Sequence, residues 1–216
     1  MRSDLEFRRI YSMADLVVAD GMPLVWLSHL AGAPLKERVA GSDMFWEIGR
    51  ASAQYGLRLF LLGGMPCSAQ IAAKKLEKQY PGAVIAGAYC PPYGSLDDPE
   101  ENAKVMDLIA KAQPDVLMVG LGAPKQEKWI AAHLDQMDVP VSIGVGASFD
   151  MAAGMVKRAP VWMQHAGLEW MFRLIQEPGR LWDRYIMRDL PYLFSAALAT
   201  LRMRSKNQES SHVSVR

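Results

Sequence analysis

Short apolar runs alternate with helix-like segments along most of this 216-residue chain, and this alternation restricts its fold more than any other feature. Five of the runs are expected to form strands, at residues 16–19, 58–62, 84–88, 116–119 and 141–145. Helices are expected between them, near residues 42–55, 66–79, 99–112 and 124–136. Continuous apolar strands that alternate with helices are typical of a parallel sheet with both faces covered. We therefore expect an α/β fold, with a Rossmann-like, mostly parallel sheet and helices on both of its faces.

The pattern changes at residue 160, which suggests a division into three parts. Residues 1–159 are predicted to form the Rossmann-like core. Residues 160–204 have helical periodicity without strand signals and are predicted to form a helical, membrane-associating appendage. Residues 205–216, SKNQESSHVSVR, are polar and are predicted to be disordered.

Composition excludes several classes of protein. The net charge of +1 gives no overall field that favours nucleic acid, so no nucleic-acid partner is expected. The two cysteines, Cys67 and Cys90, cannot form a disulfide framework or a zinc site, and they suit a reducing compartment. The four histidines are scattered and lack metal-ligand spacing, so no metal is expected. The N-terminus has no apolar signal core, and no apolar run is long enough to span a bilayer, so a cytoplasmic protein is expected.

Glycine and polar residues follow nearly every expected strand. Ligands of open parallel sheets bind beyond the carboxyl ends of the strands, where glycine allows close backbone approach and a helix N-terminus favours an anion. The candidate residues at these strand ends are Asp20, Gly21, Gly63, Gly64, Tyr93, Gly120, Gly122, Lys125, Gln126, Glu127, Gly146 and Asp150. For any one loop, a tight turn that merely needs glycine is the alternative interpretation.

The stretch VGLGAPKQEKWI, residues 119–130, only partly matches a dinucleotide-binding loop. Lys125 stands where the third glycine of G-x-G-x-x-G would be, and Phe149 stands there in the following loop. No G-x-x-x-x-G-K-[ST] stretch occurs either. These departures argue against a dehydrogenase and against a P-loop enzyme, whereas a nucleotide-sugar diphosphate remains compatible.

Three charged side chains have two interpretations each. Asp20 follows the first apolar run, where it could accept a proton from a hydroxyl or serve as a helix cap or turn residue. Asp150 has the same ambiguity. Arg38, in ERVAGSD, could pair with a phosphate or with Glu37 or Asp43.

The predicted appendage carries a basic stripe. Arg180, Arg184 and Arg188 recur every fourth residue and therefore lie on one helical face, next to Trp182 and Tyr185. This combination suits a helix lying on an anionic membrane. The alternative is a helix packed on the core with its arginines in solvent.

Several motifs together resemble a known family. In chain order they are ADGMP, ERVAGSD, LFLLGG, PPYG, VGLGAPKQEKWI, GVGASFDMAAGMVKRAP and GLEWMFRLIQEPGRLWDRY. This set resembles the WecG/TagA/CpsF glycosyltransferase family (glycosyltransferase family 26). The resemblance implies inverting, cofactor-free and metal-independent transfer of a sugar, of N-acetylmannosamine type or another hexose, from a UDP-sugar. The acceptor would be a polyprenyl-diphosphate-linked sugar, in the synthesis of cell-surface polysaccharide or teichoic-acid-type polymers.

The resemblance also implies roles for particular residues. By position in the motifs, Asp20 matches the catalytic base, and Arg38 and Gln126 match donor-site residues counted here as catalytic. Arg158, in KRAP, is expected among the substrate-binding residues. The stripe of Arg180, Arg184 and Arg188 is expected to dock on the inner face of the cytoplasmic membrane and to reach the lipid diphosphate. The protein is thus expected to be cytoplasmic and peripheral on that membrane.

One feature departs from the family pattern. Family members usually begin with another strand that ends in Thr-x-Asn, and this chain starts after that point. We therefore expect either a longer natural start or a sheet that lacks one strand and so has an open edge. The alternative function is a UDP-sugar-binding member that is catalytically impaired or non-catalytic. Homo-oligomer formation is left open.

Overall fold

The computed structural model describes residues 4–183, 187, 191 and 193–198. The chain divides into two compact units, one made of residues 1–17 and 41–157 and the other of residues 18–40 and 158–216. The tail expected at 205–216 lies outside the described residues, as do Arg184 and Arg188 of the expected basic stripe.

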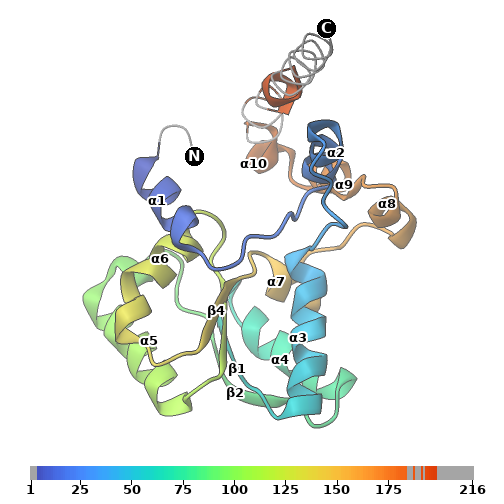
Figure 1. The fold of residues 1–216 in the computed structure, drawn as a ribbon. Coiled ribbons are helices and arrows are strands. Elements are labelled where there is room, and N and C mark those ends of the chain that lie inside the picture. The colour runs from blue at the N-terminus through green and yellow to red at the C-terminus, as the bar shows by residue number, and fades with distance from the viewer. Residues whose placement is uncertain (1–3, 184–186, 188–190, 192, 199–216) are drawn as a thin grey trace, which may run out of the picture. The chain divides into compact units, whose positions relative to one another are not determined.

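The first unit is built on a four-stranded parallel sheet, shown in Figure 1. Its strands are β1 (Arg58–Gly63), β2 (Val84–Tyr89), β3 (Val116–Gly120) and β4 (Val141–Gly144). Their spatial order is β2-β1-β3-β4, and every neighbouring pair is parallel. The expected parallel α/β sheet is therefore confirmed for these strands. The chain turns to opposite sides of β1 for β2 and β3, which makes the boundary between β1 and β3 a topological switch point.

Helices cover both faces of this sheet, as expected. They are α3 (Gly41–Tyr55), α4 (Ser68–Gln79), α5 (Pro99–Ala112), α6 (Lys125–His133) and α7 (Ser148–Ala153), while α1 (Leu5–Met13) packs on α6. Because successive strand residues point to opposite faces, Leu59 and Leu61 enter one core with α3, α4 and α7, while Phe60 and Leu62 enter the other. That second core contains residues of α5 and α6.

Local signals account for where these helices begin. Asp98 caps α5, since its Oδ1 accepts a hydrogen bond from Glu100 N at 3.0 Å, and Pro99 occupies the first turn. Helix α4 begins only at Ser68, two residues beyond Pro66, because Cys67 has a left-handed backbone with φ of 66°. Short 3-10 turns lie at Ser95–Asp97 and Leu134–Gln136.

The expectation of a strand at residues 16–19 is wrong. This run is irregular chain between α1 and α2 (Met22–Ala31), and Leu16 is 79% exposed. The sequence AspGlyMetPro that follows it begins a helix at Met22, with Gly21 as N-cap and Pro23 in the first turn. The run leads directly into this helix start, and no strand of the described residues pairs with it.

The second unit is helical wherever it has regular structure in the described residues. It contains α2, α8 (Val161–His165), α9 (Glu169–Gln176) and α10 (Pro178–Trp182), and Pro178 is the first residue of α10. Gly167, between α8 and α9, has φ of +74°, and a Cβ there would lie 2.9 Å from Met22 Cγ and 3.0 Å from Trp26. Only glycine therefore allows this turn to pack on α2. The predicted membrane-associating appendage stays a prediction. No helix within the described part is long and apolar enough to cross a bilayer.

Candidate functional site

Glycine loops meet at the carboxyl ends of β1 and β3. Gly64 N donates a hydrogen bond to Gly120 O at 2.8 Å. Gly63 has φ of +103°, and a Cβ on it would lie 2.9 Å from Gly120 C and O, so the approach requires glycine. Because β1 and β3 flank the topological switch point, these loops occupy the place where open α/β sheets bind ligands.

Gln126 holds two of the loops together. Its Oε1 accepts hydrogen bonds from Gly122 N at 3.1 Å and Gly146 N at 3.0 Å. Its Nε2 donates to Glu127 Oε1 at 2.9 Å, and the residue is only 6% exposed. The amide thus joins the loops that follow β3 and β4. Its role toward a donor, expected from the motif, stays a prediction, and in this structure its visible action is to position glycine amides.

Asp150 holds the loop that follows β1. Its Oδ1 accepts a hydrogen bond from Met65 N at 2.7 Å, and the residue is buried in α7. The same oxygen would lie 3.0 Å from a Cβ on Gly64. The structure therefore places Asp150 beside the glycines of the β1 loop. Its observed hydrogen bond goes to that loop and is not a cap of its own helix.

Tyr93 and Lys125 meet across two loops. Lys125 Nζ lies 4.7 Å from the centroid of the Tyr93 ring, a cation–π contact. Tyr93 follows β2 and is 98% exposed, whereas Lys125 begins α6 after β3. An aromatic face and a cation at strand ends are suited to a base and a phosphate.

Glu127 lies beneath this edge, on the side of α6 that faces α1. Its Oε2 is buried and makes no hydrogen bond with any residue that the structure describes. Burial, together with the negative charge of Glu127, raises the pKa of Tyr11 on α1. Glu127 is half-buried near the loops, and the substrate-binding role expected from its place at a strand end stays a prediction.

The second unit holds a cluster of its own, in which one carboxylate joins two arginines. Arg38 Nη1 donates to Glu169 Oε2 at 2.5 Å, and Arg158 Nε donates to Glu169 Oε1 at 3.3 Å. Glu169 is only 8% exposed, and glutamate is rarely so buried unless it is paired. The guanidinium groups of Arg38 and Arg158 are of the chemical type that binds phosphate.

Sequence reasoning missed Glu169. It stands in the first turn of α9, where an acidic residue is ordinarily explained by the helix dipole. Only the contacts with Arg38 and Arg158 reveal another role. For Arg38 the sequence suggested a phosphate, Glu37 or Asp43 as partner. The structure adds Glu169, a carboxylate far along the chain, with which its guanidinium pairs.

Asp20 belongs to the same unit as this cluster. It is exposed and stands directly before Gly21, the N-cap of α2. Val39 N donates to Ala19 O at 2.9 Å, so the residues adjoining Asp20 and Arg38 are hydrogen-bonded to each other. The backbone therefore brings the expected base beside the segment that carries one of the clustered arginines.

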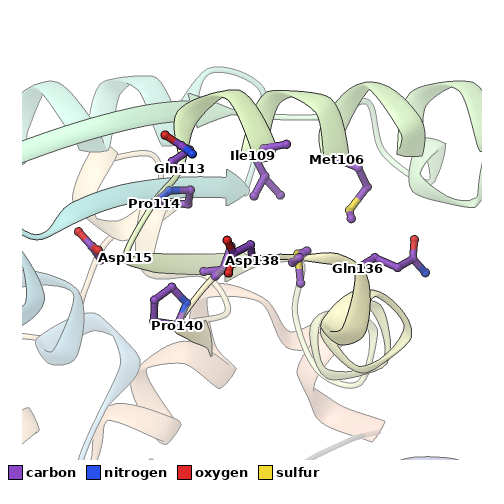
Figure 2. A pocket seen from close by; sticks show the side chains of 11 residues that line it. Met106, Ile109, Gln113, Pro114, Asp115, Gln136, Asp138 and Pro140 are labelled. Atoms are coloured by element: carbon purple, nitrogen blue, oxygen red, sulfur yellow. The ribbon is translucent and has the colours of Figure 1, made fainter.

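The remaining features are Arg180, possible metal ligands and one pocket. Arg180 lies in α10, while its two expected partners in the stripe are outside the described residues. No group of three metal-ligating side chains occurs in the described part of the chain. A pocket of about 310 Å³ lies at the opposite, amino end of β3 and β4, between Pro114, Asp115, Pro140 and the end of α5 (Figure 2). It contains none of the predicted site residues.

Comparisons with known proteins agree with the motifs. The profile of the family described as glycosyl transferase WecG/TagA/CpsF family matches residues 1–207. A Bacillus subtilis (strain 168) protein named N-acetylglucosaminyldiphosphoundecaprenol N-acetyl-beta-D-mannosaminyltransferase is 36% identical over 183 residues, which is 85% of this chain and 69% of that protein. Proteins of the same name from Bacillus spizizenii and Staphylococcus aureus (strain MW2) are 33% and 31% identical, over 96% and 81% of this chain and 77% and 66% of their own lengths. The chain therefore belongs to the WecG/TagA/CpsF family of glycosyl transferases.

Proposed function

We propose that this protein transfers N-acetylmannosamine from its UDP derivative to a polyprenyl-diphosphate-linked N-acetylglucosamine, with inversion at the anomeric carbon. The observation that carries the proposal is the shared name of relatives from three species, which are 31%, 33% and 36% identical to the chain. Such a product belongs to the synthesis of teichoic-acid-type or other cell-surface polymers.

The donor is proposed to bind at the strand ends of the first unit. The free face of the Tyr93 ring suits stacking with a nucleoside base, and Lys125 suits the diphosphate. The backbone of the glycine loops can approach the diphosphate closely because no Cβ intervenes. Gln126 and Asp150 support this arrangement by holding the loops.

The chemical step is proposed to need one base and several cations. The Asp20 carboxylate takes the proton from an acceptor hydroxyl, and that oxygen forms its bond to the anomeric carbon on the face opposite the diphosphate. The bond from the anomeric carbon to the diphosphate oxygen then breaks, and the leaving UDP takes the electron pair. Arg38 and Arg158 supply fixed positive charge for the diphosphates of the reaction, and Glu169 holds both guanidinium groups.

The acceptor suggests where the protein acts. The names of the relatives specify an undecaprenol-linked acceptor, which is a lipid. We infer action at the inner face of the cytoplasmic membrane, with Arg180, Arg184 and Arg188 contacting anionic headgroups and the lipid diphosphate. A peripheral protein with such a basic stripe would be released from anionic vesicles by salt.

The test is a transfer assay with UDP-N-acetylmannosamine and a short-chain polyprenyl-diphosphate N-acetylglucosamine. UDP release that requires both substrates, with a β-linked disaccharide as product, is the expected result. Release of UDP with another UDP-hexose only would change the donor. Binding of UDP without any transfer would instead indicate a non-catalytic UDP-sugar-binding protein.

A further inference from the structure

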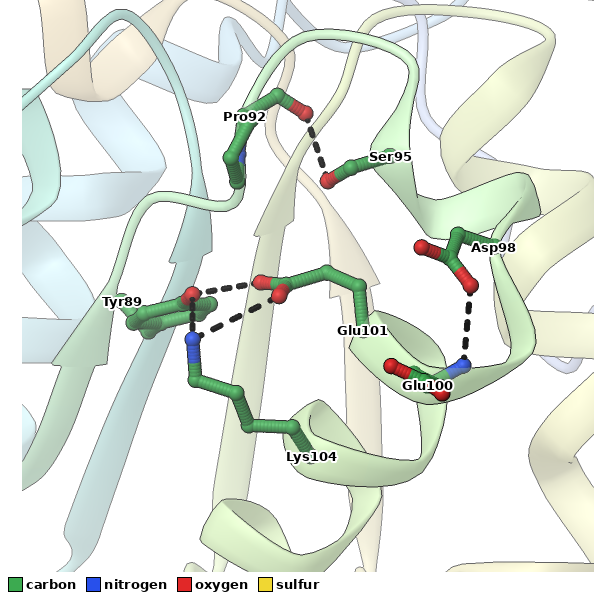
Figure 3. Close-up of polar contacts among 7 residues, drawn as sticks. All are labelled: Tyr89, Pro92, Ser95, Asp98, Glu100, Glu101 and Lys104. Carbon is green, nitrogen blue, oxygen red and sulfur yellow. Dashed lines mark hydrogen bonds and ion pairs between the residues drawn. The ribbon is translucent and has the colours of Figure 1, made fainter.

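Tyr89, the last residue of β2, is held by two charged side chains of α5, as Figure 3 shows. The Tyr89 hydroxyl donates a hydrogen bond to Glu101 Oε1 and accepts one from Lys104 Nζ. Lys104 Nζ also lies 3.4 Å from Glu101 Oε2 and 4.6 Å from the centroid of the Tyr89 ring. The end of β2 is therefore fixed to α5 by three mutually bonded groups, called here the Tyr89 trio.

The next residue is held on the opposite face of the strand. Cys90 Sγ accepts a hydrogen bond from Ala69 N at 3.3 Å, at the start of α4. The same sulfur lies 3.2 Å from both Gly63 O and Gln70 Oε1, either of which can accept its single proton. Because neighbouring strand residues point to opposite faces, Tyr89 and Cys90 fix the strand end from both sides.

The far end of the following loop is also closed. Ser95 donates from both its backbone N, at 3.0 Å, and its Oγ, at 2.8 Å, to Pro92 O (Figure 3). Asp98 then caps α5. The loop of residues 91–94 is thus held at both ends, and the two prolines, Pro91 and Pro92, further restrict its backbone.

Tyr93 lies at the tip of this fixed loop. Its side chain is the most exposed among the large apolar and aromatic residues that the structure describes. Tyr93 is 98% exposed, and Lys125 Nζ lies over its ring. An ordered frame that presents an uncovered aromatic ring lowers the conformational entropy lost when a ligand covers that ring. The arrangement is what a preorganised contact residue requires.

We propose that Tyr89, Glu101 and Lys104 are positioning residues of the donor site, which act by fixing the loop that presents Tyr93 to the donor nucleotide. The inference rests on the proposed function for the identity of the donor. None of the three residues needs to touch the ligand, since the effect passes through residues 90–93 of the backbone.

A purely stabilising role is the competing hypothesis, and the exposure of the Lys104 side chain argues against it. The Lys104 side chain is 52% exposed, and exposed ion pairs contribute little to folding stability. The hydrogen bond with Tyr89 lowers the pKa of Glu101 and raises the pKa of Lys104, so both side chains stay charged around neutral pH. Removing the network should therefore loosen the loop and leave the fold intact.

The experiment compares Tyr89→Phe and Lys104→Met with Lys111→Met as the matched control. Lys111 lies on the same helix and pairs with Asp107 at 2.6 Å, away from the loop. The Kd of UDP, measured by calorimetry, and the KM of the donor should rise about fivefold in the first two variants. The kcat and the midpoint of thermal unfolding should not change, and Lys111→Met should match the wild type throughout.

Three further variants separate positioning from a general loss of stability. Tyr93→Ala should weaken UDP binding by itself, and adding Tyr89→Phe to it should cause no further loss, because both changes act on one contact. Lys104→Arg, which keeps a donor to the hydroxyl, should restore part of the affinity.

Hydrogen exchange of residues 93–97, measured without nucleotide, tests the positioning itself. Exchange should be faster in Tyr89→Phe than in the wild type or in Lys111→Met. If the wild type binds UDP and Tyr89→Phe shows the same loop exchange or the same UDP affinity as the wild type, the inference is overturned and the proposed function stands. Absence of UDP binding by the wild type would overturn the proposed donor, while faster loop exchange in the variant would still support the positioning role.

Discussion

Arg38 and Glu169 are 131 positions apart in the chain, yet Nη1 of the arginine lies 2.5 Å from Oε2 of the glutamate. The other oxygen of that carboxylate accepts from Arg158 Nε. The side chains of Arg38 and Glu169 are only 14% and 11% exposed, so the pair is largely shielded from water. One buried carboxylate therefore sets the direction of two guanidinium groups that would otherwise repel each other.

Replacing this carboxylate should affect both stability and transfer. Glu169→Gln keeps the shape but leaves two guanidinium groups without their shared negative charge. We expect the free energy of unfolding in urea to fall by about 2 kcal/mol, as for loss of a shielded charged hydrogen bond. We also expect kcat/KM to fall by about tenfold or more, because the arginines lose their fixed direction.

The matched control is Glu47→Gln, which removes an exposed pair with Arg50. Both of those side chains are 61% exposed, so this variant should unfold at the same urea concentration as the wild type. If Glu169→Gln is as stable and as active as Glu47→Gln, the carboxylate does not position the arginines.

The strand signal in the sequence is clearest where burial is complete, although β2 and β4, which are only partly buried, were also predicted. Residues 59–62 and 116–119 are buried on both faces, so their apolar runs carry the signal by themselves. The run at 16–19 has the same composition, but no strand of the described residues pairs with it. Composition reports the tendency to be buried, whereas pairing depends on the path of the whole chain.

Gln126 offers a sharp test of how the strand-end loops are held. Gln126→Leu keeps a similar volume but removes the acceptor for the amides of Gly122 and Gly146. Two partly buried amides would lose their partner, at a cost of up to about 1–3 kcal/mol each. We expect lower stability in urea and loss of measurable UDP binding by calorimetry.

Gln126→Glu is the discriminating companion. It keeps an acceptor for both glycine amides but places a second carboxylate where Nε2 now lies, 2.9 Å from Glu127 Oε1. The two carboxylates would share a proton, so their pKa would rise and the stability lost at neutral pH should return as pH falls. A stability deficit that does not depend on pH would contradict the assigned orientation of the amide.

The site was predictable from sequence only where a residue type carries its own signal. The strand-end glycines, Tyr93 and Lys125 were predicted as candidates because strand ends meet at one edge of a sheet, whereas the contact between Lys125 and Tyr93 was not predicted. The holding roles of Gln126 and Glu169 were not predicted, since Gly146 lies 20 positions from Gln126 and Arg38 lies 131 positions from Glu169. Such pairings are properties of the folded chain and leave no local pattern.

The attachment of α1 to α6 should depend on pH. Asp4 Oδ1 accepts from Phe7 N at 2.9 Å, and Lys128 Nζ lies 2.9 Å from Asp4 Oδ2. The hydrogen bond from Phe7, followed by Lys128, lowers the pKa of Asp4. A lowered pKa in the folded state stabilises the fold above the pKa of the unfolded state, and this contribution is lost as pH falls through the folded value.

Hydrogen exchange of the α1 amides between pH 7 and pH 3 measures this dependence, after correction for the intrinsic exchange rate. Protection of α1 should fall with pH in the wild type, and it should fall less in Asp4→Asn, which keeps a capping oxygen but has no charge to lose. The same slope in both proteins would show that Asp4 does not control the attachment.

Chelation tests the proposal that side chains alone supply the positive charge. With Arg38, Arg158 and Lys125 in that role, transfer should be unchanged by excess EDTA. Loss of transfer that magnesium or manganese restores would contradict the proposal. Calorimetry with UDP in EDTA provides the control, since it separates a metal needed for binding from one needed for the chemical step.

The base assignment is tested by Asp20→Asn. The change removes the proton acceptor but keeps the shape of the side chain, so kcat should fall by about 100-fold or more. The Kd of UDP should stay within about twofold, because the proposed base contacts the acceptor and not the nucleotide. Asp15→Asn is the matched control, an exposed aspartate five positions earlier that should keep full activity. Full transfer by Asp20→Asn would rule out Asp20 as the base, whereas an equal loss in both variants would point to the fold of the segment and not to proton transfer.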